Sequence, residues 1–310
     1  MEKPYKRLTY TFDDVDTFAS HISQGILEYH QLEPGKFYGE LTEILSEKVI
    51  VSTHAMNRIV QQQGPGIENY TTFLLPGNMS QDFSWREQRL TGKRIGILKS
   101  KMYHFAISLP NFFGTPISLN NNYFNDLIIK HHYDTNIYKE IQHREAININ
   151  PEDAYEMQQI VIALCSSNIV DYNLLTKKIP LLLLKAIENV YSESIEPVSG
   201  SRVIIFMKSI DFINKKLAQQ INVTNVVKAV DISERNLRYI FKEKIGISPK
   251  NYIKALKLNK VRKEIKGTLG KPNIGMIASN WGFNHSGQFA ADYKRLFGEL
   301  PSETLKIEIT

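Results

Sequence analysis

The sequence predicts an α+β protein whose first part is rich in strands and whose last third is almost entirely helical. Between about residues 5 and 118, short apolar runs are separated by turn signals such as Glu33-Pro34-Gly35 and Pro76-Gly77-Asn78. Many short strands with regular turns are typical of a sandwich or a small barrel. From about residue 202 onward, apolar residues recur at helical spacing instead.

The strand-rich part is followed by predicted helices and then by a linker. The expected strands include residues 37–45, 48–52, 71–75, 95–98 and 105–109. A helix is expected to begin at Pro151, because proline and the acidic residues after it suit a first turn, and a second helical run covers 181–190. Residues 191–201 lack periodicity and are rich in Ser, Glu, Pro and Gly, which indicates a linker. The predicted domains are therefore 1–194 and 195–310.

Charge is distributed unevenly between the two parts. Residues 201–310 contain 20 Lys and Arg against 9 Asp and Glu, whereas residues 1–200 contain 18 basic and 23 acidic residues. A basic domain attached to an acidic one fits a module that binds a polyanion such as nucleic acid. A solvated lysine-rich surface would give the same counts, so charge alone does not identify the partner.

Composition restricts the compartment. Cys165 is the single cysteine, so no disulfide can form within the chain, which favours a reducing compartment. No apolar signal core follows Met1, and the longest apolar stretch, around 181–184, is too short to span a bilayer. We therefore expect a soluble, cytoplasmic protein without a membrane partner. Cys165 lies on an apolar helical face and is interpreted as a buried structural thiol.

The first candidate helix-turn-helix unit covers about residues 223–246. Thr224 is expected to cap a short helix over 225–230. After a turn, Ser233 is expected to cap a second helix over 234–243.

The second helix of this unit has two distinct faces. Leu237, Ile240 and Phe241 share one face because of their i, i+3, i+4 spacing. Arg235 and Arg238 fall near each other on another face. A helix that packs along one side and presents guanidinium groups along the other can enter a major groove and bond to guanine.

The second candidate unit covers about residues 274–297. Ile277 and Ala278 supply the apolar face of its short first helix. Gly282 is expected to take a positive φ at the turn, where a side chain would be strained. The second helix is expected over 285–297, and its first turn is where recognition helices touch bases.

A linking helix is predicted between the two units. Residues 249–266 carry apolar residues interspersed with lysines, and at 1.5 Å per residue this helix is about 27 Å long. Such a connector could hold two recognition helices roughly 34 Å apart, which is one turn of DNA. Both helices could then engage successive major grooves on one face of the duplex.

With these features the C-terminal region resembles the DNA-binding domain of the AraC/XylS family of transcription regulators. The most specific match is Ile277-Ala278-Ser279-Asn280-Trp281-Gly282-Phe283, followed by Phe289, Tyr293-Lys294, Phe297-Gly298 and Pro301. The first unit matches more loosely through Ser233, Arg235, Leu237, Phe241, Gly246 and Pro249. The resemblance covers roughly the last 90 residues. Three residues depart from the commonest family pattern: Tyr239, Gly287 and Ala291 stand where many members have Arg, Ser and Arg.

The resemblance also implies a role for the N-terminal part. Family members often have a cupin-like barrel with helices there, which senses a small effector, forms a dimer, or does both. Double-stranded DNA and RNA polymerase are the partners implied for the C-terminal domain. A small-molecule effector and a homodimer are further partners that the family resemblance brings into consideration.

The candidate DNA-contacting residues lie on the two predicted recognition helices. They are Ser233, Arg235, Asn236, Arg238, Tyr239, Lys242, His285, Ser286 and Gln288. Each could instead be a solvated surface residue, and Ser286 could serve only as a hydrogen-bonding group at the helix start. The predicted core residues are Leu237, Phe241, Trp281, Phe283, Phe289, Tyr293 and Phe297. Lysines of the linking helix (Lys250, Lys254, Lys257 and Lys260) could attract phosphates or simply form a solvated face.

No residue pattern indicates a metal, a cofactor or a catalytic site. His131-His132 and His143 fit neither zinc-finger nor HExxH spacing. Gly64-Pro65-Gly66 is a turn, and no Walker A, Rossmann or G-x-S-x-G motif occurs. We therefore expect no cofactor and no enzymatic activity.

The function that these observations favour is a sequence-specific transcription regulator, an activator by the family resemblance, controlled by a small effector or by dimerisation. One alternative is a constitutive DNA-binding architectural or regulatory dimer that binds no ligand. Another is an enzyme fused to a helix-turn-helix domain, against which the lack of clustered catalytic groups argues.

Overall fold

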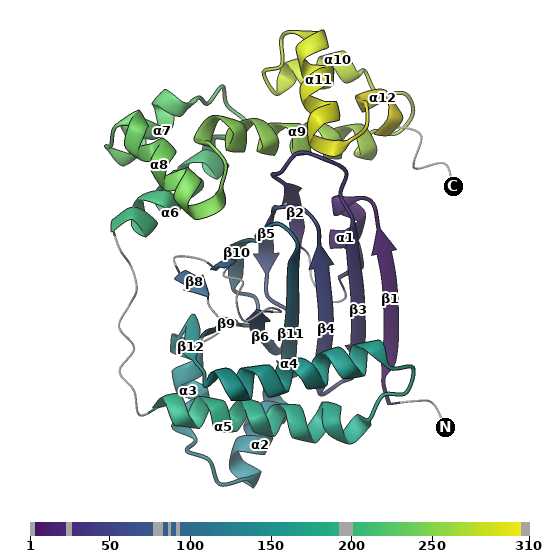
Figure 1. Ribbon diagram of the computed structural model, residues 1–310, viewed down its shortest axis with the longest axis vertical. Coiled ribbons are helices and arrows are strands. Elements are labelled where there is room, and N and C mark those ends of the chain that lie inside the picture. Colours follow the sequence, from purple (N-terminus) through teal and green to yellow (C-terminus); the bar gives the residue numbers. More distant parts are fainter. Residues whose placement is uncertain are drawn as a thin grey trace.

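The computed structural model describes residues 4–22, 27–76, 83–85, 88–90, 94–191 and 201–304. Within these residues, two β-sheets and a group of helices form the N-terminal part, and a set of helices alone forms the C-terminal part (Figure 1). The α+β class and the change from strands to helices along the chain are therefore confirmed.

The larger sheet, called sheet A here, has seven strands. Its order is β1 (Lys6–Phe12), β3 (Gly39–Leu45), β4 (Val49–Met56), β11 (Phe112–Asn120), β6 (Tyr70–Pro76), β9 (Arg94–Leu98) and β12 (Ala146–Asn148). All neighbouring strands are antiparallel.

The smaller sheet, called sheet B, has five antiparallel strands. Its order is β2 (Glu28–Gln31), β5 (Val60–Pro65), β10 (Tyr103–Ile107), β7 (Phe83–Trp85) and β8 (Gln88–Leu90). Sheets A and B are separate hydrogen-bonded sheets in the part of the chain that the structure describes, and they do not join there into a closed barrel. The expected small barrel is thus corrected to two open sheets, because β1, β12, β2 and β8 all remain edge strands.

Strand β4 shows why these sequences form sheets with two buried faces. Val49 and Val51 belong to a core shared with the N-terminal helices. The alternate residues Ile50, Ser52 and His54 line a cavity between the sheets. Because side chains point to opposite faces with a period of two, a strand between two layers must satisfy both.

The helices of the N-terminal part pack mainly against sheet A. They are α1 (Val15–His21), α2 (Asn121–Lys130), α3 (Asn136–His143), α4 (Pro151–Ser166), the π-helix η1 (Leu174–Lys178) and α5 (Ile179–Tyr191). The helix predicted to begin at Pro151 and the helical run predicted over 181–190 correspond to α4 and α5, whereas α1 was not predicted. Cys165 is buried in the same core, and burial raises the pKa of its thiol to about 11, in agreement with a structural thiol.

The C-terminal part consists of helices α6 to α12. They are α6 (Ser201–Lys216), α7 (Val223–Val230), α8 (Glu234–Ile245), α9 (Pro249–Gly267), α10 (Ile274–Asn280), α11 (Ser286–Phe297) and α12 (Pro301–Thr304). None of the helices in the described ranges is long and apolar enough to cross a membrane. Most of the predicted linker, residues 192–200, lies outside the described residues.

Helix α9 joins the two parts of the C-terminal region and lies against β2 of sheet B (Figure 1). In the figure, α7 and α8 lie at one end of α9, while α10, α11 and α12 lie at its other end. Leu32, Ile59 and Ile107 from the N-terminal part share one hydrophobic core with the C-terminal helices. The two parts of the chain therefore pack as neighbours through buried apolar contacts.

Replacement of Phe124, which is fully buried between sheet A and the helices, tests this core. We expect Phe124→Ala to lower the free energy of unfolding by about 3–5 kcal/mol, because the change leaves a cavity that the surroundings fill only in part. Ile169, which is 82% exposed, provides the control: Ile169→Ala should change the same quantity by less than about 0.5 kcal/mol. Chemical denaturation of both variants measures the difference, and equal effects would contradict the packing described here.

Candidate nucleic-acid interface

Hydrogen bonds at the helix ends define the first unit, α7–turn–α8. Asn222, rather than the predicted Thr224, caps α7. Its side-chain Oδ1 accepts from the backbone N–H of Asn225, and Asn225 Oδ1 accepts in return from the backbone N–H of Asn222. Asp231 ends α7 with a φ of 53°, a left-handed conformation that Asp tolerates better than most residues. Ser233 caps α8 as predicted, because its Oγ accepts from the Asn236 amide at 3.2 Å.

The apolar face of α8 is anchored as the sequence predicted. Leu237, Ile240 and Phe241 are buried. The Phe241 ring meets the rings of Phe206 on α6 and Tyr252 on α9 edge to face, at centroid distances of 5.1 and 5.6 Å. Such contacts fix the orientation of α8 relative to its neighbours.

The opposite face of α8 is open to solvent. All six residues predicted there as DNA contacts are exposed: Ser233, Arg235, Asn236, Arg238, Tyr239 and Lys242. The Arg238 guanidinium forms an exposed ion pair with Glu234, 3.2 Å away on the preceding turn. Because exposed pairs of this kind are weak, the guanidinium can exchange that partner for a base or a phosphate.

Tyr239 and Lys242 also have contacts within the protein. The Arg202 guanidinium lies over the Tyr239 ring, 5.0 Å from its centroid, and Lys242 Nζ donates to the Gly246 carbonyl at 3.0 Å. These two side chains therefore help to hold α6 and the end of α8 in place. Arg202 thereby joins the exposed face of α8, a placement that its sequence position in another helix did not reveal.

The second unit, α10–turn–α11, repeats this plan. Asn273 caps α10 by accepting from the Met276 amide at 3.0 Å. Gly282 has a φ of 85° at the turn, as predicted. Trp281, expected in the core, is only partly buried, and its indole N–H donates to Glu264 of α9 at 2.8 Å, which ties the turn to the linking helix.

Helix α11 has one buried aromatic face and one exposed polar end. Phe289, Tyr293 and Phe297 are buried as predicted, whereas Phe283 of the turn is partly buried. The predicted contacts His285, Ser286 and Gln288 all lie exposed at the start of this helix. His285 makes no side-chain hydrogen bond to the helix start, so its side chain is not committed to capping the helix.

The lysines of α9 do not form one free basic face. Lys254 donates to Asp292 of α11 at 2.9 Å, and Lys260 pairs with Glu28 of β2 at 3.3 Å. Burial lowers the pKa of Lys257, while Lys250 is exposed. The prediction of phosphate contacts thus has less support for Lys254 and Lys260, whose charges are engaged within the chain.

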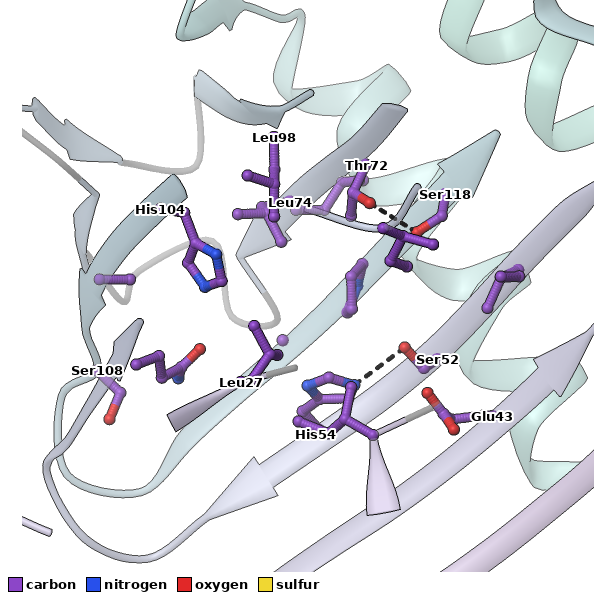
Figure 2. Close-up of a pocket in the computed structure, with 18 of the residues that line it drawn as sticks. Leu27, Glu43, Ser52, His54, Thr72, Leu74, Leu98, His104, Ser108 and Ser118 are labelled. Carbon is purple, nitrogen blue, oxygen red and sulfur yellow. Dashed lines mark hydrogen bonds between the residues drawn. The ribbon is translucent and has the colours of Figure 1, made fainter. Parts of the chain in front are cut away.

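A second candidate site is the cavity between the two sheets, which has a volume of about 100 Å³ (Figure 2). Its walls are formed by β3, β4, β6, β9 and β11 of sheet A together with β2, β5 and β10 of sheet B. Most lining side chains are apolar, and the polar exceptions include Ser52, His54, Thr72 and Ser118. Removal from water lowers the pKa of His54 to about 4, so its ring is neutral near pH 7.

The paired units in the C-terminal part define a class: a DNA-binding domain in which one helix connects two helix-turn-helix modules. Residues 226–307 match the family model described as a helix-turn-helix domain. The chain is 36% identical over 106 residues to the XylDLEGF operon transcriptional activator 3 of Pseudomonas putida, and this aligned stretch covers 33% of this chain and 31% of that protein. It is 30% identical over 125 residues to a probable thc operon regulatory protein of Rhodococcus erythropolis, and this aligned stretch covers 40% of this chain and 38% of that protein.

The chain thus spans about a third of the length of these relatives. Among solved structures, the AraC-like transcriptional activator CuxR aligns over 84% of this chain and 96% of its own, with 11% identity and a TM-score of 0.43. The helix-turn-helix region of this protein is thus similar to a helix-turn-helix family model and to the operon regulators named above, in agreement with the AraC/XylS resemblance of its sequence motifs.

Two glycines of the second unit provide a test of its turn. We expect Gly282→Ala to lower the free energy of unfolding by about 1–2 kcal/mol, because its φ of 85° strains any residue with a Cβ. Gly287 lies in α11 with nothing within 4 Å of an added Cβ. Gly287→Ala should therefore raise the same free energy by roughly 0.4–1 kcal/mol. Thermal and chemical denaturation compare the two variants, and effects of the same sign would argue against this turn geometry.

Proposed function

We propose that this protein is a sequence-specific DNA-binding transcription regulator that reads bases with α8 and α11. The observation that carries the proposal is the repeated geometry of the two units. Each buries the apolar face of its second helix and leaves polar residues of that helix exposed, and α9 connects the two. Its 19 residues correspond to about 28 Å, a length compatible with docking in successive major grooves.

The same proposal assigns a role to each part of the chain. Residues 195–310 form the DNA-binding domain, and residues 1–194 form a domain that senses a small effector or mediates dimerisation. The facing sheets A and B would be an open form of the cupin-like barrel that the family resemblance implies. The names of the Pseudomonas putida relatives describe transcriptional activators, which supports activation as the mode of regulation. In this proposal the protein acts on RNA polymerase in the cytoplasm and has no enzymatic activity.

Selection of a genomic DNA fragment library by the full-length protein tests sequence-specific binding. At two salt concentrations, we expect enrichment of one motif with two contacted segments about one helical turn apart. Affinity should fall as salt rises, because phosphate contacts release counterions. Salt-sensitive binding without any enriched motif would overturn the proposal and leave a non-specific basic module.

Arg238→Ala tests the recognition role of α8. We expect the variant to lose about 1–3 kcal/mol of binding free energy and to relax preference at one base pair. Lys215→Ala is a matched control, since Lys215 on α6 is likewise exposed and pairs with an acidic residue, Asp211, four positions earlier. Binding measured across operator variants compares the two, and an unchanged base preference for Arg238→Ala would remove this residue from the recognition set.

A further inference from the structure

The cavity between sheets A and B has a mostly apolar lining without lysine or arginine among its described residues. We propose that it is the effector site of the regulator and that it takes a small uncharged molecule, apolar over most of its surface, with one or two hydrogen-bonding groups. The inference rests on the proposed function for its regulatory meaning, but the binding itself can be measured without DNA.

The size and lining of the cavity limit the ligand. A volume of about 100 Å³ is of the order that accommodates a single six-membered ring, because an engineered apolar cavity of about 150 Å³ binds benzene. Leu27, Leu74, Leu98 and Phe112 contribute apolar surface from both sides. A compact apolar molecule would therefore bury most of its surface there.

Two hydrogen-bonded pairs contribute polar groups to the cavity (Figure 2), and Gln62, His104 and Ser108 add further ones. Ser52 Oγ lies 3.1 Å from His54 Nε2, and Thr72 Oγ1 lies 2.8 Å from Ser118 Oγ. Hydroxyl groups can both donate and accept, and they rotate to suit a partner. These pairs can accommodate a hydroxyl, an amide or a carbonyl group of a ligand without leaving a charge uncompensated.

The electrostatics of the lining disfavour an anion. None of the described lining residues is a lysine or an arginine, and Glu43 contributes a carboxyl group to the wall. The His54 ring is neutral near pH 7, since burial lowers its pKa to about 4. His104 is the second imidazole of the described lining, and no permanently charged cation stands beside the two rings. A carboxylate ligand would therefore lose its hydration without gaining a permanently cationic partner there, which is costly.

Thermal unfolding of the full chain with matched probes tests this site. We expect benzyl alcohol, benzamide or cyclohexanol to raise the midpoint temperature in a concentration-dependent way, because a ligand that binds only the folded state stabilises it. Benzoate at the same concentrations should leave the midpoint unchanged. An equal shift with benzoate, or no shift with any of the three uncharged probes, would overturn the proposal.

Ala106→Leu locates the binding within the cavity. Ala106 lines it from β10, so the larger side chain should occupy the space and abolish the probe-induced shift. Ala55→Leu is the control, because Ala55 follows the cavity-lining His54 on β4 and points to the opposite face. If Ala106→Leu does not fold, Ser118→Ala serves instead and should weaken binding of the hydroxyl-bearing probes. A midpoint shift that persists in Ala106→Leu would show that the probe binds outside the cavity and would overturn the proposed site. DNA selection without a ligand tests the proposed function separately, so the two failures can be distinguished.

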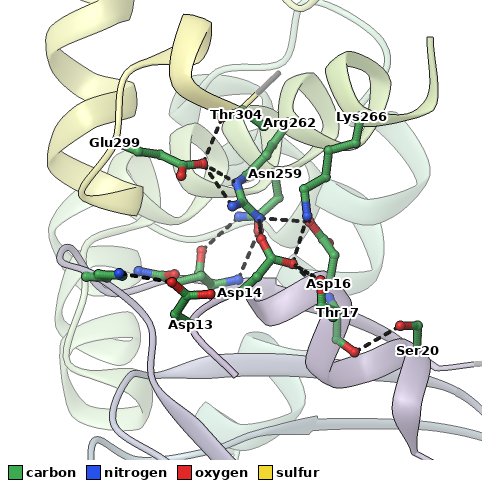
Figure 3. A network of polar contacts seen from close by, with 12 residues as sticks. Asp13, Asp14, Asp16, Thr17, Ser20, Asn259, Arg262, Lys266, Glu299 and Thr304 are labelled. Carbon is green, nitrogen blue, oxygen red and sulfur yellow. Dashed lines mark hydrogen bonds and ion pairs between the residues drawn. The ribbon is translucent and has the colours of Figure 1, made fainter. Parts of the chain in front are cut away.

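A different observation concerns the contact between α9 and the N-terminal part. The Arg262 side chain is 4% exposed and pairs with Asp14, with Asp16 at 3.0 Å and with Glu299 at 2.9 Å (Figure 3). Lys266, one turn further along α9, pairs with Asp14 at 2.8 Å. Arg262 thus joins the linking helix, the start of α1 and the segment after α11 at one point.

The charges of this network depend on one another. Burial alone raises the pKa of Asp14, but the charges of Arg262 and Lys266 outweigh it and hold that pKa well below its usual range. Burial and the neighbouring Asp14 charge raise the pKa of Asp16. Each carboxylate that is removed leaves the charges of Arg262 and Lys266 with fewer partners, which is costly, so the members of the network stabilise the contact together.

Strand β2 adds a second connection beside the network. The Asn259 side chain of α9 makes two hydrogen bonds to the backbone of Gln31. It accepts from the Gln31 backbone N–H at 3.0 Å and donates to the Gln31 backbone carbonyl at 2.8 Å. The Gln31 side chain donates to the Leu296 carbonyl of α11 at 2.6 Å. Glu28 pairs with Lys260 and Lys263. The free edge of sheet B is therefore bonded both to α9 and to the second unit.

We infer that the N-terminal part fixes the separation and orientation of the two recognition helices and thereby restricts the spacing of the DNA segments that the protein accepts. Phe105 and Ile107 of β10 pack into the core shared with α6 and α8, while Gln31 and Asp16 hold α9 and α11. Both units thus rest on one rigid sheet. This inference also depends on the proposed mode of DNA binding.

The double variant Asp14→Asn/Glu28→Gln weakens this contact from the N-terminal side, because it removes the carboxylate charges that pair with Arg262, Lys266 and Lys263. Asn can still cap α1, and the variant changes no residue of the DNA-binding helices. Selection from DNA in which the two contacted segments vary in separation should show a single preferred spacing for the unmodified protein. For the variant, discrimination against neighbouring spacings should fall about fivefold or more. Glu28→Gln alone is the milder substitute if the double variant does not fold.

The matched control is Glu68→Gln/Glu40→Gln, because Glu68 pairs with exposed Lys101 at 2.6 Å and Glu40 accepts from Tyr38 on the surface. It should keep the spacing preference of the unmodified protein. Identical spacing preferences for all three proteins would overturn the inference while leaving sequence-specific binding intact. Failure of the unmodified protein to enrich any motif would instead contradict the proposed function.

Discussion

The buried guanidinium of Arg262 is the charge on which the arrangement of the chain depends. It lies where α9, the start of α1 and the segment after α11 meet, and it is paired with carboxylates from each side. A charge in such a place is stable only with all its partners in position. The contact therefore specifies how the helical region sits on the N-terminal part, whereas the apolar core beside it supplies most of the attraction.

Sheet B contacts the cavity with one of its faces and helix α9 of the DNA-binding region with the other. On β2, Leu27 precedes the strand and lines the cavity together with Tyr29, whereas Glu28 between them pairs with lysines of α9. On β5, Gln62 lines the cavity while Gln61 accepts a hydrogen bond from Tyr252 of α9. The period-two alternation of a strand thus brings a ligand site and a DNA-binding region into contact with the same backbone.

The sequence predicted the C-terminal region well because its signals are local. Caps, turn glycines and i, i+3, i+4 spacing act within a few residues, so Ser233, Gly282 and the buried face of α8 were found at the expected positions. The N-terminal strands were found in part, but their pairing was not, since sheet order depends on contacts between distant segments. The cap at Asn222 instead of Thr224 shows the limit of such signals where two capping residues are close together.

By itself, the sequence determined the class of the protein, the two helix-turn-helix units and the polar faces of their second helices, because each follows from short-range spacing and side-chain chemistry. Only the tertiary structure decided that Lys254 and Lys260 serve internal ion pairs. It alone revealed the cavity between the sheets and the Arg262 network, whose paired residues lie up to 252 positions apart. These features arise where segments remote in sequence pack together, and no local pattern records which segments will meet.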